Sequence, residues 1–98
     1  MNVLTTESAK LLIDAILSLK TEEECAAFIE DIMTTKEILD MSQRMMVAKL
    51  LDEGLVYSKI MELSGASSTT ISRVNRCYSY GPGGYKTVLS RIREEEKK

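Results

Sequence analysis

Histidine is absent from this 98-residue sequence, and proline, cysteine and glycine are scarce, with one, two and five residues respectively. Histidine is the most common general base in enzymes, and no glycine-rich phosphate loop or nucleophile elbow is present. The two cysteines, Cys25 and Cys77, are too few for a disulfide framework and would need carboxylates to complete a zinc site. We therefore expect two free, partly buried thiols, no metal, no cofactor and no enzymatic activity.

Long apolar runs are missing as well. No segment approaches the roughly 20 apolar residues that a membrane helix requires, and residues 1–19 carry acidic groups where a secretory signal peptide has basic ones. We expect a cytoplasmic protein without a membrane partner.

The scarcity of proline and glycine leaves long stretches free to form helices. A single domain of this length buries a modest core, so dimerisation would supply what one chain lacks.

Charge is unevenly distributed behind the overall value of −2. Residues 1–56 hold five basic and eleven acidic side chains, which gives a net charge of −6. Residues 57–93 hold six basic side chains against Glu62 alone, a net charge of +5, and the last five residues add −1. This asymmetry indicates that the second half of the chain faces a polyanion.

Helix-start signals and apolar periodicity predict an all-α chain of six helices. Two capping boxes, each a threonine followed three residues later by glutamate, mark helix starts: Thr21 with Glu24 and Thr34 with Glu37. The first helix follows Thr6 and is expected to end near Lys20, and the third is expected to run to Gly54. Shorter helices then follow over about 58–63 and 68–78, with a glycine-rich loop at 81–84 before the last helix.

The third predicted helix is apolar over more of its circumference than a surface helix needs. Its apolar residues are Ile38, Leu39, Met41, Met45, Met46, Val47, Leu50 and Leu51. We expect it to be buried on several sides by a second copy of the chain, a compact monomeric bundle being the alternative. Within one domain spanning residues 1–98, we assign 1–54 to dimerisation helices, 57–78 to a helix-turn-helix and 85–97 to a C-terminal helix.

The segment 57–76 meets the physical requirements of a helix-turn-helix one by one. Gly65 stands where the first helix must stop and the chain must turn. Ser67 is a suitable N-cap for the second helix, because its hydroxyl can accept a backbone hydrogen bond. Apolar side chains can hold the two helices together and against the body of the domain; these are Ile60, Leu63, Ala66, Ile71 and Val74.

The opposite face of the second helix is polar and carries two arginines. Thr69, Ser72, Arg73 and Arg76 follow the i, i+3, i+4, i+7 spacing of a single helix face. Hydroxyls, threonine methyls and arginines are side chains that contact base edges and phosphates in DNA. The candidate DNA-binding residues are Ser67, Ser68, Thr69, Thr70, Ser72, Arg73 and Arg76. A solvated helix face, or an adaptor that docks an acidic protein partner on this basic helix pair, is the alternative.

Two stretches of the sequence resemble a known family. Residues 33–76, and above all 65–73, resemble the Trp repressor family, and residues 80–89 are similar to its YerC/YecD branch. The Trp repressor is itself a standard example of the helix-turn-helix, so the docking geometry is what the resemblance implies. It implies a six-helix fold, an interlaced homodimer and a transcriptional regulator of duplex DNA with a palindromic operator.

The resemblance also places a possible small-molecule effector site. Tryptophan-sensing members hold the indole between two arginines; one of these positions matches Arg73, whereas the other matches Gln43. The neighbouring Arg44 is expected to point about 100° away around the helix. This departure argues against tryptophan as the ligand. The family's basic positions on the preceding helix hold Ser58 and Met61 here, which predicts a different operator.

Overall fold

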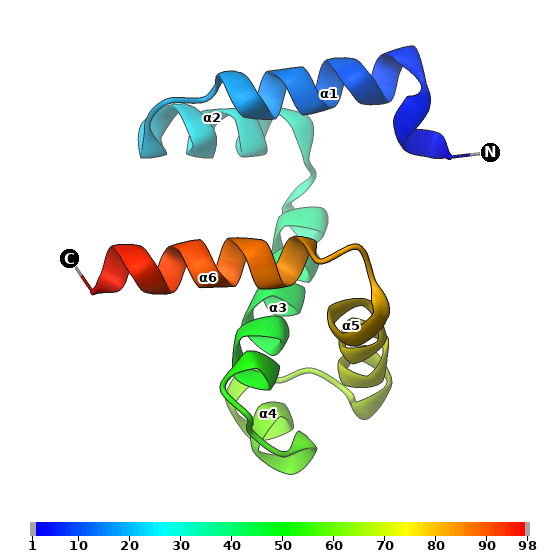
Figure 1. Ribbon diagram of the computed structural model, residues 1–98, viewed down its shortest axis with the longest axis vertical. Coiled ribbons are helices and arrows are strands. Elements are labelled where there is room, and N and C mark those ends of the chain that lie inside the picture. The colour runs from blue at the N-terminus through cyan, green and yellow to red at the C-terminus, as the bar shows by residue number, and fades with distance from the viewer. Residues whose placement is uncertain (1, 98) are drawn as a thin grey trace. The chain divides into compact units, whose positions relative to one another are not determined.

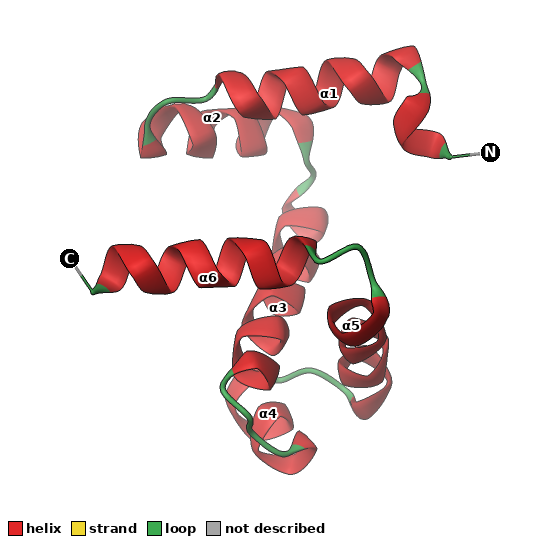
Figure 2. Cartoon of the chain, in the orientation of Figure 1, coloured by secondary structure: helices red, strands yellow, loops and turns green. Residues whose placement is uncertain are grey.

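The computed structural model describes residues 2–97, and every regular element within that range is helical (Figures 1 and 2). The elements are a short 3-10 helix η1 (Val3–Thr5) followed by α1 (Glu7–Ser18), α2 (Glu22–Ile32), α3 (Thr35–Asp52), α4 (Tyr57–Ser64), α5 (Ser68–Tyr80) and α6 (Gly84–Glu96). The all-α, six-helix prediction is therefore confirmed. None of the helices in this range is long and apolar enough to cross a membrane.

The predicted capping boxes form, one of them with a shift of one residue. At α3, the Glu37 amide donates to Thr34 Oγ1 at 3.1 Å and the Thr34 amide donates to Glu37 Oε1 at 2.9 Å. At α2, the Glu24 amide donates to Thr21 Oγ1 at 3.1 Å, but Glu24 Oε1 accepts from the amide of Lys20 instead of Thr21. Lys20 thus takes part in capping α2 and does not end α1, which stops earlier than predicted, at Ser18.

The chain divides into two compact units, one ending at Ile38 and the other beginning at Leu39. In the first unit, none of the described residues is buried. Several large apolar side chains of α1 and α2 are open to solvent: Leu17 is 76% exposed, and Leu12, Ile16 and Ile32 are exposed as well, whereas Phe28 and Ile29 are partly buried. Packing within one chain therefore covers the apolar side chains of α1 and α2 only in part.

The second unit contains the hydrophobic core. Its buried side chains come from all four helices and the α4–α5 turn: Val47, Ala48, Leu50, Ile60, Ala66, Ile71, Val74 and Leu89. Met45, Leu51, Leu55, Tyr78 and Tyr85 pack around them and are partly buried. Because Ile71 and Val74 belong to this core, it fixes which face of α5 points outward.

Two burial predictions, those for Leu63 and Cys77, are wrong. Within one chain, α3 is buried along one side only, and Leu39, Met41 and Met46 are exposed, Leu39 by 65%; their burial by a second copy of the chain stays a prediction. Ile60 and Leu63 were both expected to hold the helix pair together; Ile60 is fully buried as predicted, but Leu63 is 54% exposed. Cys25 is partly buried as predicted, whereas Cys77 lies on the exposed side of α5.

Candidate nucleic-acid interface

α4 and α5 form the predicted helix pair, and Gly65 makes the turn between them. Gly65 has a positive φ of 73°, and its amide donates to the Met61 carbonyl at 2.9 Å, which closes the end of α4. Glycine adopts this left-handed conformation without the steric cost that a side chain brings. Ser64 Oγ donates to the Ile60 carbonyl and accepts from the Ala66 amide, which fixes the chain as it leaves the helix.

Ser67 caps α5 as predicted. Its hydroxyl oxygen accepts a hydrogen bond from the Thr70 amide at 3.1 Å, and the same hydroxyl donates to Thr70 Oγ1 at 3.1 Å. The cap satisfies one of the free amides in the first turn of the helix. Two of the candidate DNA-binding residues, Ser67 and Thr70, therefore already form hydrogen bonds with each other at the N-terminus of α5.

The outer face of α5 brings the remaining candidates together. Ser68, Thr69, Ser72, Arg73 and Arg76 are all exposed and line one shallow hollow of about 370 Å³. Thr70 lies apart from this group and is partly buried. Neither Arg73 nor Arg76 has a carboxylate partner among residues 2–97. Their charges are thus available to an anion, in contrast to Arg93, which forms an ion pair with Asp52.

A second, smaller pocket shares Arg73 with the first, and both candidate effector residues, Gln43 and Arg73, line it. Its volume is about 190 Å³, and it is lined by Asp40, Gln43, Arg44, Thr70, Arg73 and Val74. Gln43 Nε2 donates to the Ser64 carbonyl at 3.4 Å, so part of its hydrogen-bonding capacity is used within the chain. Arg44 lines the same pocket, although its position on α3 predicted that it would point away. Arg73 borders both hollows.

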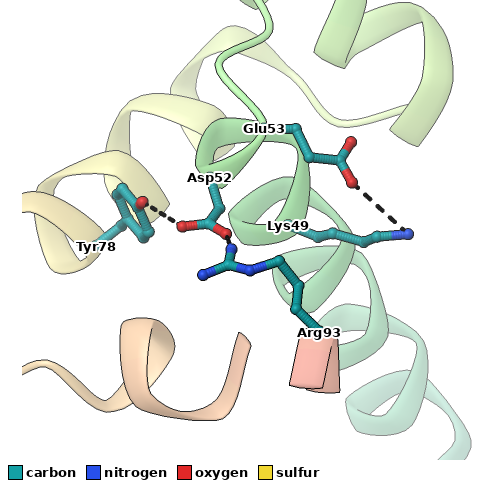
Figure 3. A network of polar contacts seen from close by, with 5 residues as sticks. All are labelled: Lys49, Asp52, Glu53, Tyr78 and Arg93. Atoms are coloured by element: carbon teal, nitrogen blue, oxygen red, sulfur yellow. Dashed lines mark hydrogen bonds and ion pairs between the residues drawn. The ribbon is translucent and has the colours of Figure 1, made fainter. Parts of the chain in front are cut away.

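Two polar links position α5, and sequence reasoning missed both. Asn75 Nδ2 donates to the Tyr57 hydroxyl at 3.1 Å, which joins α5 to the start of α4. Tyr78 donates its hydroxyl proton to Asp52 Oδ1 at 2.6 Å, and Asp52 also accepts from Arg93 (Figure 3). These partners are 18 to 41 residues apart in the chain, so no local pattern could have indicated them.

Comparisons with known proteins agree on one family. The model of the Trp repressor protein family matches residues 7–93. The uncharacterised protein YerC of Bacillus subtilis (strain 168) is 48% identical over 85 residues, covering 87% of this chain and 82% of YerC. The crystal structure of a TrpR-like protein from Eubacterium eligens ATCC 27750 is 49% identical, with a TM-score of 0.88 over 94% of this chain and 95% of that one.

A crystal structure of a proposed Trp repressor from Staphylococcus aureus is similar to the same degree. It is 41% identical, and the alignment has a TM-score of 0.88 and covers 95% of each chain. Both solved structures thus share the fold of this chain over nearly their whole length. Their sequence identities to it, 49% and 41%, indicate family membership as well as a shared fold. The chain therefore belongs to the Trp repressor family and, within it, to the branch that contains YerC.

Proposed function

We propose that this protein is a transcriptional regulator that binds duplex DNA sequence-specifically, as a homodimer on a palindromic operator. The observation that carries the proposal is the outer face of α5, where Ser72, Arg73 and Arg76 are exposed while Ile71 and Val74 anchor the helix from behind. A helix of this kind can enter the major groove, which is about 12 Å wide. Membership of the Trp repressor family supports the same function.

The chemistry of α5 suggests how the two kinds of contact are divided. Its first turns present small hydroxyl side chains, Ser68, Thr69 and Ser72, which fit close to base edges and to thymine methyl groups. The arginines follow further along the helix, where guanidinium groups can reach guanine or the phosphate backbone. On α4, Ser58 and Met61 are exposed and uncharged, so α5 supplies most of the readout.

Exposed apolar surface supports the homodimer. The described residues up to Ile38 include no buried side chain, although α1 and α2 carry many large apolar ones. In the second unit, Met45, Met46, Leu89 and Ile92 line a hollow of about 500 Å³ between α3 and α6. Open apolar surfaces on this scale are typical of protein interfaces. In a two-fold symmetric dimer the two copies of α5 would enter successive major grooves about 34 Å apart.

A fluorescence anisotropy titration against duplex DNA tests the proposal. The double variant Arg73→Ala/Arg76→Ala is expected to lose most of its affinity, because it removes four unpaired arginines from a dimer. The matched control, Lys20→Ala/Arg91→Ala, removes the same charge from exposed positions outside α4 and α5 and should bind nearly as wild type. Unchanged binding by the Arg73/Arg76 variant would refute the interface.

The target sequence and the alternative role can be determined in parallel. Selection from a random duplex library near physiological salt is expected to enrich a palindrome with two half-sites one helical turn apart.

The alternative function is an adaptor whose α4–α5 pair docks an acidic protein. It would be favoured if the purified protein ignored duplex DNA at low salt while retaining a bound acidic partner.

We further propose that DNA binding does not require tryptophan. Gln43 stands where the resemblance indicates an arginine, and its amide already donates to the Ser64 carbonyl. The pocket of about 190 Å³ beside Arg73 nevertheless has room for a small ligand. Calorimetry against tryptophan and other amino acids distinguishes these cases: we expect no heat with tryptophan and equal operator affinity with and without it.

A further inference from the structure

Asp52, near the C-terminus of α3, joins three helices through one carboxylate. Its Oδ1 accepts a hydrogen bond from the Tyr78 hydroxyl of α5 at 2.6 Å, and its Oδ2 forms an ion pair with Arg93 of α6 (Figure 3). The Asp52 side chain is only 13% exposed. Hydrogen bonds to a shielded carboxylate are short and stronger than those between neutral groups. Asp52 is thus a junction between the recognition helix and the rest of the unit.

The neighbouring ion pair shows what is specific to Asp52. Lys49 Nζ lies 3.9 Å from Glu53 Oε2, Lys49 belonging to α3 and Glu53 following its last residue, and their side chains are about half exposed, at 50% and 46% (Figure 3). Pairs of this kind contribute little to stability because solvent screens them. The Lys49–Glu53 pair also connects no second helix. Substituting Glu53 therefore gives a matched control for substituting Asp52.

Tyr78 is the last anchor on α5. Val74 is the last buried residue of the helix, and among residues 76–80 only Tyr78 is shielded from solvent, packed against the core. Lys86 of α6 lies over its ring, with Nζ 5.1 Å from the ring centroid. Beyond Tyr80 the chain passes into the glycine-rich connection to α6. Apart from the hydrogen bond of Asn75 to Tyr57 at its beginning, the C-terminal half of α5 is therefore held in place through this one side chain.

We propose that Asp52 is a positioning residue: through Tyr78, and with Arg93 as its counter-charge, it locks the C-terminal half of α5 in the orientation that reads DNA, with no ligand bound. Arg76 lies between the Val74 and Tyr78 anchors, so a swing of α5 about its buried end would displace its guanidinium group. Holding a binding element in its bound geometry raises affinity by lowering the ordering cost. The consequence for DNA rests on the function proposed above, whereas the locking of α5 can be measured without DNA.

Hydrogen exchange tests the lock directly. Tyr78→Phe keeps the ring and its contact with Lys86 but removes the hydroxyl that reaches Asp52. We expect the backbone amides of residues 75–80 to lose about tenfold of their protection, while amides of α3 in the core, residues 47–50, keep theirs. Asp52→Ala, which removes both acceptor oxygens, should have a similar effect, and the matched control Glu53→Ala should have none. Equal protection in all variants, or a uniform loss across the chain, would overturn the proposal.

A second measurement separates positioning from mere stabilisation. In Tyr78→Phe, affinity for the selected operator is expected to fall about tenfold, while affinity for unrelated duplex DNA and the dimer population stay unchanged. Combining Asp52→Ala with Tyr78→Phe should add little to either single change, because both break the Asp52–Tyr78 hydrogen bond. An equal loss on operator and unrelated DNA would refute a role in reading sequence. If the wild type binds no DNA, the function proposed above fails, and the exchange experiment alone decides on the lock.

Discussion

Arg76 offers the sharpest test of how α5 meets DNA, because its place on the helix predicts a single type of contact. It is the ninth residue of α5, so its Cα lies about 12 Å along the helix axis from that of Ser68, at a rise of about 1.5 Å per residue. That distance exceeds the depth of the major groove, about 8.5 Å, into which the first turn would project. If the first turn of α5 touches base edges as proposed, Arg76 would lie at the rim of the groove, and we expect it to contact phosphate.

The magnitude follows from the dimer. Arg76→Ala removes one phosphate contact from each subunit, and each contact contributes about 0.9 to the slope of log affinity against log salt concentration, so the slope should fall by about 1.8. Raising salt fourfold, from about 50 to about 200 mM, would then weaken the wild type roughly 12-fold more than the variant. Because phosphate carries no sequence information, the ratio of operator to unrelated-DNA affinity should stay the same.

The assay is an anisotropy titration at several salt concentrations with operator and scrambled duplexes. Arg91→Ala, an exposed arginine on α6, serves as the single-charge control and should leave the slope unchanged. An unchanged slope for Arg76→Ala, combined with loss of discrimination between the two duplexes, would show that Arg76 reads a base. The docking depth inferred from the helix rise would then be wrong.

Four further predictions concern the scaffold. Ser67→Ala removes the cap of α5 and should lower the free energy of unfolding by about 1 kcal/mol in urea denaturation; no change would mean that the Thr70 amide finds another acceptor. Gly65→Ala places a side chain at a φ of 73° and should cost about 1 kcal/mol in the same measurement, a neutral result being evidence that the turn relaxes. Ile71→Ala empties a fully buried site and should cost about 2–5 kcal/mol, seen as a lower midpoint; a cost below about 1 kcal/mol would contradict its place in the core. Leu17→Glu puts a charge on the exposed apolar face of α1, where Leu17 is 76% exposed, and sedimentation should show monomers; an intact dimer would exclude this face from the interface.

Local signals in the sequence predicted those parts of the fold that local chemistry determines. The capping box of Thr34 and Glu37, the turn at Gly65 and the cap at Ser67 each depend on residues within four positions of one another, and all three form. The outward face of α5 was predictable for the same reason, since helical periodicity alone separates Ile71 and Val74 from Ser72 and Arg73.

Burial and long-range polar contacts were less predictable. Apolar periodicity indicates which face of α3 avoids water but not whether the covering atoms belong to the same chain, so Leu39 and Met46 are exposed here. Periodicity places Ile60 and Leu63 on the same side of a two-turn helix, and only the crossing geometry of the helices determines that Ile60 is buried and Leu63 is not. The Asp52–Tyr78 bond joins residues 26 positions apart and has no counterpart in local patterns.

The open first unit has a consequence for how the protein is maintained in a cell. A segment whose described residues include none that are buried gains little folding free energy from its own packing, so α1 and α2 would draw most of theirs from association. In the proposed homodimer, folding of that segment is then governed by mass action, and its melting temperature should rise with protein concentration. At low copy number, newly made chains would remain monomeric for longer, and their first unit would stay accessible to proteases during that time. The lifetime of the protein would then depend on its own concentration.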